Sequence, residues 1–224
     1  DFEAELANPV NLGLPAWAEG RTEGFLFPDT YEVPDGVKPE TMVRIVTAQF
    51  KAVTNKLDFY NAAQALDFGP QYKSATPADK AYMALIVASI IEREVSRAED
   101  RPKVARVIYN RLDQNMPLQL DSTVSYALGT SDIQLNADEL KTNSPYNTYV
   151  RRGLPPRPIN SPGEAALDAA LSPAKGKWLY FVSVDPTTHE TKFARTYEKF
   201  LELKREFQQN MASASADPSA SASP

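Results

Sequence analysis

The chain has 224 residues, of which 42% are hydrophobic, with a net charge of −5 and no cysteine. This length suits one large domain or a domain with a small appendage, and the acidic charge gives no support for nucleic acid as the main partner. The lack of cysteine excludes thiol catalysis and disulfides, and the single histidine, His189, excludes a multi-histidine metal centre. Catalysis therefore falls to carboxylates, Tyr, Lys or Arg, and we expect no metal or cofactor.

The chain begins without a methionine or a signal peptide, and we expect a fragment of a longer protein. Residues 1–22 read as the end of a helix followed by a loop rich in Pro and Gly. The next stretch, Glu23–Glu32, is dense in aromatic residues. We expect Phe25, Phe27 and Tyr31 to pack into the core, although aromatic rings there could instead stack on sugars. Apolar spacings of three and four predict helix over Lys38–Leu66.

The longest nearly unbroken apolar run in the chain is Ala81–Ile91. Just before it, Thr76 and Asp79 have the spacing of a capping box, and Pro77 suits the first helical turn. A run that is apolar on all sides predicts a buried helix, here about Pro77–Val95. The run is shorter than the roughly 20 residues of a membrane span.

Two glutamates, Glu92 and Glu94, follow this run directly. Burial and the negative end of a helix both raise the pKa of a carboxyl, as a general acid near neutral pH requires. A glutamate here could equally reach solvent or pair with Arg93, Arg97 or Arg101. Helical spacing does not separate the two glutamates, because each lies on an apolar side of the helix.

A second amphipathic helix is predicted from Asp100 to Leu112. Beyond it, period-two alternation places two leucines on one face of an extended segment and Gln119 and Asp121 on the other. This segment is either a half-buried strand with a wet face or a polar pair presented beside the end of the central helix. We expect Ser122 to cap a short helix, Thr123–Leu128.

The last third of the chain alternates loops with short elements. The loop Tyr146–Pro158 is long, aromatic and stiffened by proline, and loops of this kind in compact domains are usually functional. Further elements are expected as short helices at Asn136–Lys141 and Ser161–Leu171, a hairpin of Trp178–Val184 with Lys192–Ala194, and a helix at Tyr197–Asn210. Residues 212–224 contain only small residues, proline and an aspartate and are expected to be disordered. The fold class is therefore α+β, mostly helical, with a small antiparallel sheet and long structured loops.

Six motifs occur in an order that resembles the YceG-like endolytic murein transglycosylases, and the likeness runs from about Leu12 to Phe207. The motifs are Glu23–Tyr31, Ala88–Glu94, Val107–Leu112, Leu118–Val124, Tyr146–Tyr149 and Gly153–Pro156. The resemblance implies a domain over residues 23–211, preceded in 1–22 by the remnant of a LysM-like subdomain and a linker. It also implies a protein held at the extracytoplasmic face of the bacterial membrane by an N-terminal helix absent from this sequence.

The resemblance further implies a lyase that cuts the MurNAc–GlcNAc β-1,4 bond of peptidoglycan glycan strands without water and leaves 1,6-anhydroMurNAc ends. The family's catalytic glutamate, taken as the first in its motif, falls on Glu92. Partners would be glycan strands and peptidoglycan synthases. The expected substrate contacts are Gln119, Asp121, Asn147 and Tyr149, with the Tyr146–Pro158 loop lining the same cleft as Glu92.

Two other interpretations stay open at this stage. One is a non-catalytic glycan-binding or scaffold module of the wall-synthesis machinery, in which the aromatic segments hold the strand. The other is an ordinary glycoside hydrolase, in which Asp121 or Glu94 acts as a second carboxylate.

Overall fold

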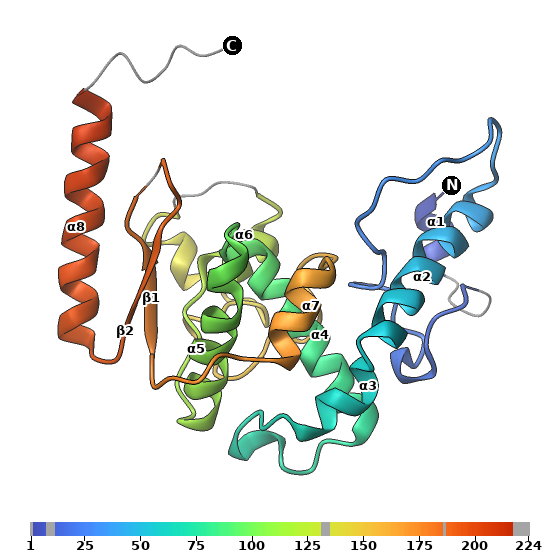
Figure 1. The fold of residues 1–224 in the computed structure, drawn as a ribbon, viewed down its shortest axis with the longest axis horizontal. Helices are drawn as coiled ribbons and strands as arrows, with labels where there is room; N and C mark the ends of the chain where they lie inside the picture. Colours follow the sequence, from blue (N-terminus) through green and yellow to red (C-terminus); the bar gives the residue numbers. More distant parts are fainter. Residues whose placement is uncertain (1, 8–11, 131–134, 186, 217–224) are drawn as a thin grey trace.

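A computed structural model of the protein describes residues 2–7, 12–130, 135–185 and 187–216. It has an α+β fold that is mostly helical, with one two-stranded antiparallel sheet among the described residues (Figure 1). The α-helices and strands are α1 (Phe2–Leu6), α2 (Pro39–Lys56), α3 (Phe59–Ala62), α4 (Pro77–Glu94), α5 (Arg101–Asp113), α6 (Asp121–Leu128), α7 (Glu164–Leu171), β1 (Tyr180–Ser183), β2 (Thr191–Ala194) and α8 (Tyr197–Ala216). Single 3₁₀ turns are η2 (Ala16–Ala18), η3 (Ala63–Ala65), η4 (Pro70–Tyr72), η5 (Ala98–Asp100) and η6 (Glu139–Lys141).

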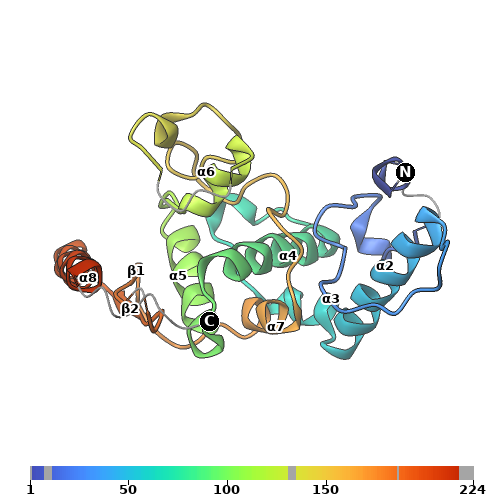
Figure 2. The same ribbon diagram turned by 90° about the horizontal axis from the view of Figure 1, so that it is seen from above.

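Helix α4 is the centre of the fold, with α6 and its loops on one side and α7 on the other (Figure 2). Its start is the predicted capping box: the Thr76 hydroxyl accepts a hydrogen bond from the Asp79 N–H, and the Asp79 carboxylate accepts one from the Thr76 N–H. Every residue from Ala81 to Ile91 is buried, which confirms the expected central helix. Within the described part of the chain, no helix is long and apolar enough to span a bilayer.

The N-terminal third packs on the first half of α4 through aromatic rings. Trp17, Phe25 and Phe50 lie with ring centroids 5.0–6.1 Å apart, a spacing typical of stabilising aromatic pairs. Phe25 and Phe27 are buried, as expected, whereas Tyr31 is only half-buried and its hydroxyl donates to the Phe27 carbonyl oxygen. The single helix predicted over residues 38–66 is wrong in its length: α2 ends at Lys56, because the chain turns at a left-handed Asp58 (φ 47°) before α3 begins.

The C-terminal hairpin and α8 form a small separate layer at one edge of the molecule (Figure 1). Strands β1 and β2 pair in antiparallel fashion, with Tyr180 opposite Ala194, and Leu203 of α8 packs against them. The hairpin is confirmed. Helix α8 continues to Ala216, so the first residues of the expected disordered tail are helical, and residues 217–224 lie outside the described part.

Candidate active site

The two candidate glutamates diverge at the end of α4. The helix stops at Glu94 because Val95 adopts an extended conformation. Residues two apart on an α-helix point about 200° apart, so Glu92 and Glu94 face different parts of the protein. Their surroundings differ accordingly, and this difference decides what each carboxyl can do.

Glu92 is held from both sides by fixed donors. Arg101, the first residue of α5, donates from Nη2 to Glu92 Oε1 at 3.0 Å, and the Gly163 N–H donates to Oε2 at 3.0 Å. Gly163 is the N-cap residue of α7, where the helix dipole favours a negative charge. The Glu92 and Arg101 side chains are only 25% and 15% exposed. Glu92 therefore ties α4 to the starts of α5 and α7, through its ion pair with Arg101 and its hydrogen bond from the Gly163 N–H.

Glu94 points instead to the start of α6. The Ser122 hydroxyl donates to Glu94 Oε1 at 2.5 Å, and the side chain is half-buried. Desolvation raises the pKa of Glu94 to about 7, the nearby Asp121 carboxylate adds to the rise, and hydrogen bonds from Ser122 and the charge of Arg93 oppose it. A carboxyl with a pKa near neutrality can both give and take a proton at physiological pH.

A buried arginine fixes the segment that leads to α6. The Arg111 guanidinium donates to the carbonyl oxygens of Pro117, Leu118 and Leu179, at 2.6–2.9 Å. These bonds fix the backbone on either side of Gln119. Gln119 Oε1 also accepts a hydrogen bond from Arg111 Nη1 at 3.3 Å. The alternation predicted from the sequence is present, with two buried leucines and exposed Gln119 and Asp121, but the segment is irregular and no strand forms.

Two of the four expected substrate contacts, Asp121 and Tyr149, lie near Glu94. The Tyr149 hydroxyl donates to Asp121 Oδ1, and Asp121 precedes Ser122 at the start of α6. Burial is the main reason that the pKa of Tyr149 is raised, and the Asp121 and Glu94 carboxylates raise it further, so the ring stays a neutral donor. The Tyr146–Pro158 loop thus brings its Tyr149 near Glu94 and Asp121.

Asn147, the fourth expected contact, has a different position. It is fully buried, and its amide nitrogen donates to the carbonyl oxygens of Leu140 and Thr142. Its Oδ1 accepts from the Tyr149 N–H. All of these bonds go to the loop backbone and use both amide N–H donors, so Asn147 shapes the loop that carries Tyr149.

The predicted role of Ser122 as a helix cap is wrong. It was expected to cap a helix at Thr123, whereas α6 begins at Asp121, its N-cap Leu120 makes no side-chain cap, and the Ser122 hydroxyl bonds Glu94. No local pattern predicts this contact, because the two residues are 28 positions apart. The nearest indication in the sequence is the pair Gln119 and Asp121, which the alternation of polar and apolar residues predicts beside the end of the central helix.

The remaining candidate group, His189, lies in the turn between β1 and β2, where its φ of 55° matches a tight turn. The described residues contain no group of three or more His, Cys, Asp or Glu side chains that could hold a metal ion. The groups that α4, α6 and the Tyr149 loop bring together are one desolvated carboxyl and two hydroxyl donors, Ser122 and Tyr149, and this set suits proton transfer.

Comparison with known proteins shows which family the chain belongs to. A profile of the YceG-like family matches residues 4–206. The chain belongs to the YceG-like family. It is 36% identical over 186 residues to the endolytic murein transglycosylase of Bacillus subtilis, covering 83% of this chain and 48% of that protein.

Two further proteins to which this YceG-like chain is similar support the same family. The endolytic murein transglycosylase of Streptococcus pneumoniae is 32% identical over 187 residues, which is 81% of this chain and 31% of that protein. The crystal structure of a yceG-like protein from Listeria monocytogenes matches with a TM-score of 0.73 at 30% identity, over 90% of this chain and 63% of that one. The chain thus spans a third to a half of the length of the curated relatives it matches.

Proposed function

We propose that this chain is the catalytic part of an endolytic murein transglycosylase, a lyase that cuts the MurNAc–GlcNAc β-1,4 bond within peptidoglycan glycan strands and leaves 1,6-anhydroMurNAc ends. The names of its relatives and its family membership support this choice of substrate. Such cuts would limit the length of newly made strands. The protein would act at the extracytoplasmic face, near peptidoglycan synthases, anchored by an N-terminal helix outside this sequence.

We assign the catalytic role to Glu94 in place of Glu92, the residue favoured by the sequence. The observation that carries the assignment is the contrast between the two carboxyls: desolvation raises the pKa of Glu94 to about 7, whereas Glu92 is occupied by Arg101 and the Gly163 N–H. An acid must carry its proton at working pH and must be free to deliver it. Glu94 meets both conditions.

The reaction needs one carboxyl in two successive roles. Protonated Glu94 gives its proton to the leaving oxygen as the bond from C1 to that oxygen breaks. The resulting carboxylate takes the proton of the MurNAc 6-hydroxyl as that oxygen bonds C1, which restores the acid. Ser122 stabilises the intermediate carboxylate through its hydrogen bond to Oε1. No water enters, so the second carboxylate of ordinary glycosidases is not required.

The polar groups around Glu94 supply contacts for the sugars. Gln119 and Asp121 are exposed next to the start of α6, and Tyr149 is oriented by its bond to Asp121. We propose these three as hydrogen-bonding partners for sugar hydroxyls and acetamido groups. Asn147 is left out of this set because its side chain is used within the loop.

A digestion of purified, uncrosslinked glycan strands tests the function. The products are separated and weighed by mass spectrometry, because an anhydro end is lighter than a reducing end by one water. We expect anhydro ends formed inside long strands. Reducing ends would point to a hydrolase that uses Asp121 as a second carboxylate. Binding without any cleavage would favour the scaffold interpretation.

A further inference from the structure

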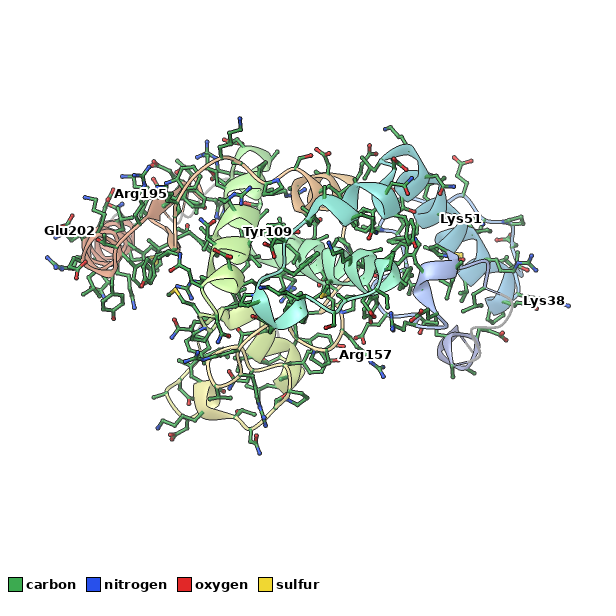
Figure 3. All side chains as sticks on the ribbon, turned by 90° about the horizontal axis from the view of Figure 1, so that it is seen from below. Lys38, Lys51, Tyr109, Arg157, Arg195 and Glu202 are labelled. Atoms are coloured by element: carbon green, nitrogen blue, oxygen red, sulfur yellow. The ribbon has the colours of Figure 1, made fainter. Side chains whose placement is uncertain are left out.

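Helix α6 and the loop that carries Tyr149 lie together on one side of α4 (Figure 2 and Figure 3). A pair of buried threonine hydroxyls joins the loop to the helix. Thr148 of the loop is 1% exposed, Thr123 of α6 is fully buried, and their Oγ1 atoms lie 2.9 Å apart. Both residues are too buried to contact a substrate directly, so any effect they have on the site passes through their neighbours.

The hydrogen bonds of this pair fix the direction of each hydroxyl proton. Thr123 donates its only hydroxyl proton to the Leu120 carbonyl oxygen at 2.7 Å. The proton between the two threonines therefore comes from Thr148, whose Oγ1 in turn accepts a hydrogen bond from the Leu120 N–H at 3.0 Å. Thr148 is donor and acceptor at once, and a valine of the same shape could be neither.

The backbone of Thr148 holds an unusual turn at the entrance to α6. Its carbonyl oxygen accepts a hydrogen bond from the Gln119 N–H at 3.0 Å, and Gln119 has a left-handed φ of 53°. A residue other than glycine seldom adopts this conformation unless its surroundings fix it. Because this turn directs the chain into α6, the contacts of Thr148 determine where the first residues of the helix lie.

The polar groups near Glu94 are next to these contacts in the chain. Tyr149 is the next residue of the loop, and Asp121 and Ser122 directly precede the α6 threonine. Their own hydrogen bonds, from Tyr149 to Asp121 and from Ser122 to Glu94, lie at exposed or half-buried positions, where water competes for the same groups. The buried threonine pair is shielded from that competition. Placement matters here, since a shift of about 1 Å in a catalytic group can cost about 10²-fold in rate.

We propose that Thr148 is a positioning residue, whose hydroxyl fastens the loop to the start of α6 and so holds the polar groups around Glu94 in place. Ser122 is the group through which this placement reaches the Glu94 carboxyl. The effect on catalysis rests on the proposed function. The effect on the surroundings of Glu94 does not depend on cleavage and is measured separately.

The kinetic test compares Thr148→Val, which keeps the shape of the side chain, with Thr148→Ser, which keeps the hydroxyl. In chains shown to be folded, Thr148→Val should lower kcat/KM for anhydro-product formation about 10²-fold, and Thr148→Ser should restore most of it. Thr54→Val is the matched control, because Thr54 is also buried and its hydroxyl donates to a backbone carbonyl within α2. The control should cut at the unmodified rate, and a folded Thr148→Val chain that does so too would overturn the proposal.

A double-mutant cycle separates positioning from a general loss of packing. When Ser122→Ala and Tyr149→Phe have already removed the two hydroxyls of the site, Thr148→Val should lower kcat/KM by about threefold at most. The same loss in both backgrounds would show that Thr148 acts independently of these groups and would refute the proposal.

A titration of Glu94 followed by NMR needs no cleavage. Its carboxyl carbon is the signal that Glu94→Gln removes. Desolvation raises the pKa of Glu94, the Ser122 hydrogen bond opposes this rise, and Asp121 adds less than that bond removes, while the nearby Arg93 lowers the pKa slightly. Thr148→Val should therefore move the titration to higher pH, in the same direction as Ser122→Ala.

The outcomes of the two measurements are distinguishable. An unmoved titration in a folded Thr148→Val chain would refute the positioning role, whatever the chain cuts. A moved titration in a protein that forms no anhydro ends would refute the lyase and retain the positioning role. If Thr148→Val does not fold, Thr123→Val removes the other hydroxyl of the pair and replaces it in both measurements.

Discussion

Replacing Ser122 by alanine probes how the surroundings of Glu94 set its pKa. The lost hydroxyl donates at 2.5 Å to Glu94 Oε1 and stabilises the charged form. Hydrogen bonds to charged groups contribute about 1.5–3 kcal/mol, and 1.36 kcal/mol corresponds to one pH unit. Removing this bond should raise the pKa of Glu94 from about 7 by roughly one to two units. Alanine is tolerated in the first turn of α6, so the fold should be retained.

The assay is the rate of anhydro-product formation as a function of pH. Because the acid must start protonated, kcat/KM should fall as the pH rises through the pKa of Glu94, and in Ser122→Ala this fall should move to higher pH. The plateau rate should also drop, since a less stabilised carboxylate makes a weaker acid. Ser122→Thr restores a hydroxyl and should restore the profile. His189→Gln, which removes the only histidine, should leave the fall in place, and an unmoved profile in Ser122→Ala would refute this account of the site.

Three further substitutions test the contacts that stabilise the fold around the site. Arg101→Met leaves the Glu92 carboxylate with one donor and should lower the free energy of unfolding by about 1–3 kcal/mol in urea titrations, while cleavage stays near the unmodified rate. Thr76→Ala removes half of the capping box of α4 and should cost about 1 kcal/mol in the same titration. Gly69→Ala forces a Cβ to within 2.3 Å of the Leu112 carbonyl oxygen at a φ of +90°, and a loss of less than about 2 kcal/mol would contradict the described packing.

The features that the sequence predicts well are those with a local cause. The start of α4 follows from Thr76 and Asp79, which lie in one helical turn, and its burial follows from an uninterrupted apolar run. The hairpin follows from two short apolar segments joined by a turn. In each case the residues that determine the element are neighbours in the chain.

The features that the sequence does not predict depend on distant partners. Glu92 and Glu94 are equivalent in helical periodicity, and they differ only because Arg101 and Gly163 meet the first and Ser122 meets the second. Gly163 lies 71 residues from Glu92 along the chain. The resemblance identified the motif correctly but does not by itself show which carboxyl is desolvated. That distinction needs the packing of α5, α6 and α7 around the end of α4.

Stability measurements give an independent view of the two glutamates. The pKa of Glu94 is raised from 4.5 to about 7, so the folded state loses stability as the pH rises through this range. Glu94→Gln removes the penalty and should raise the free energy of unfolding at pH 8 by up to about 3 kcal/mol. Glu92→Gln should have the opposite effect, because it leaves the half-buried Arg101 without a charged partner.

The most direct test of the account is to count anhydro ends formed from glycan strands by Glu94→Gln and Glu92→Gln side by side. A general acid and base contributes about 10²–10⁴-fold, and here one group serves both steps, so Glu94→Gln should fall by at least the upper end of that range. Glu92→Gln, once shown to be folded, should cut near the unmodified rate. A dead Glu92→Gln beside an active Glu94→Gln would contradict the assignment and restore the prediction made from the sequence.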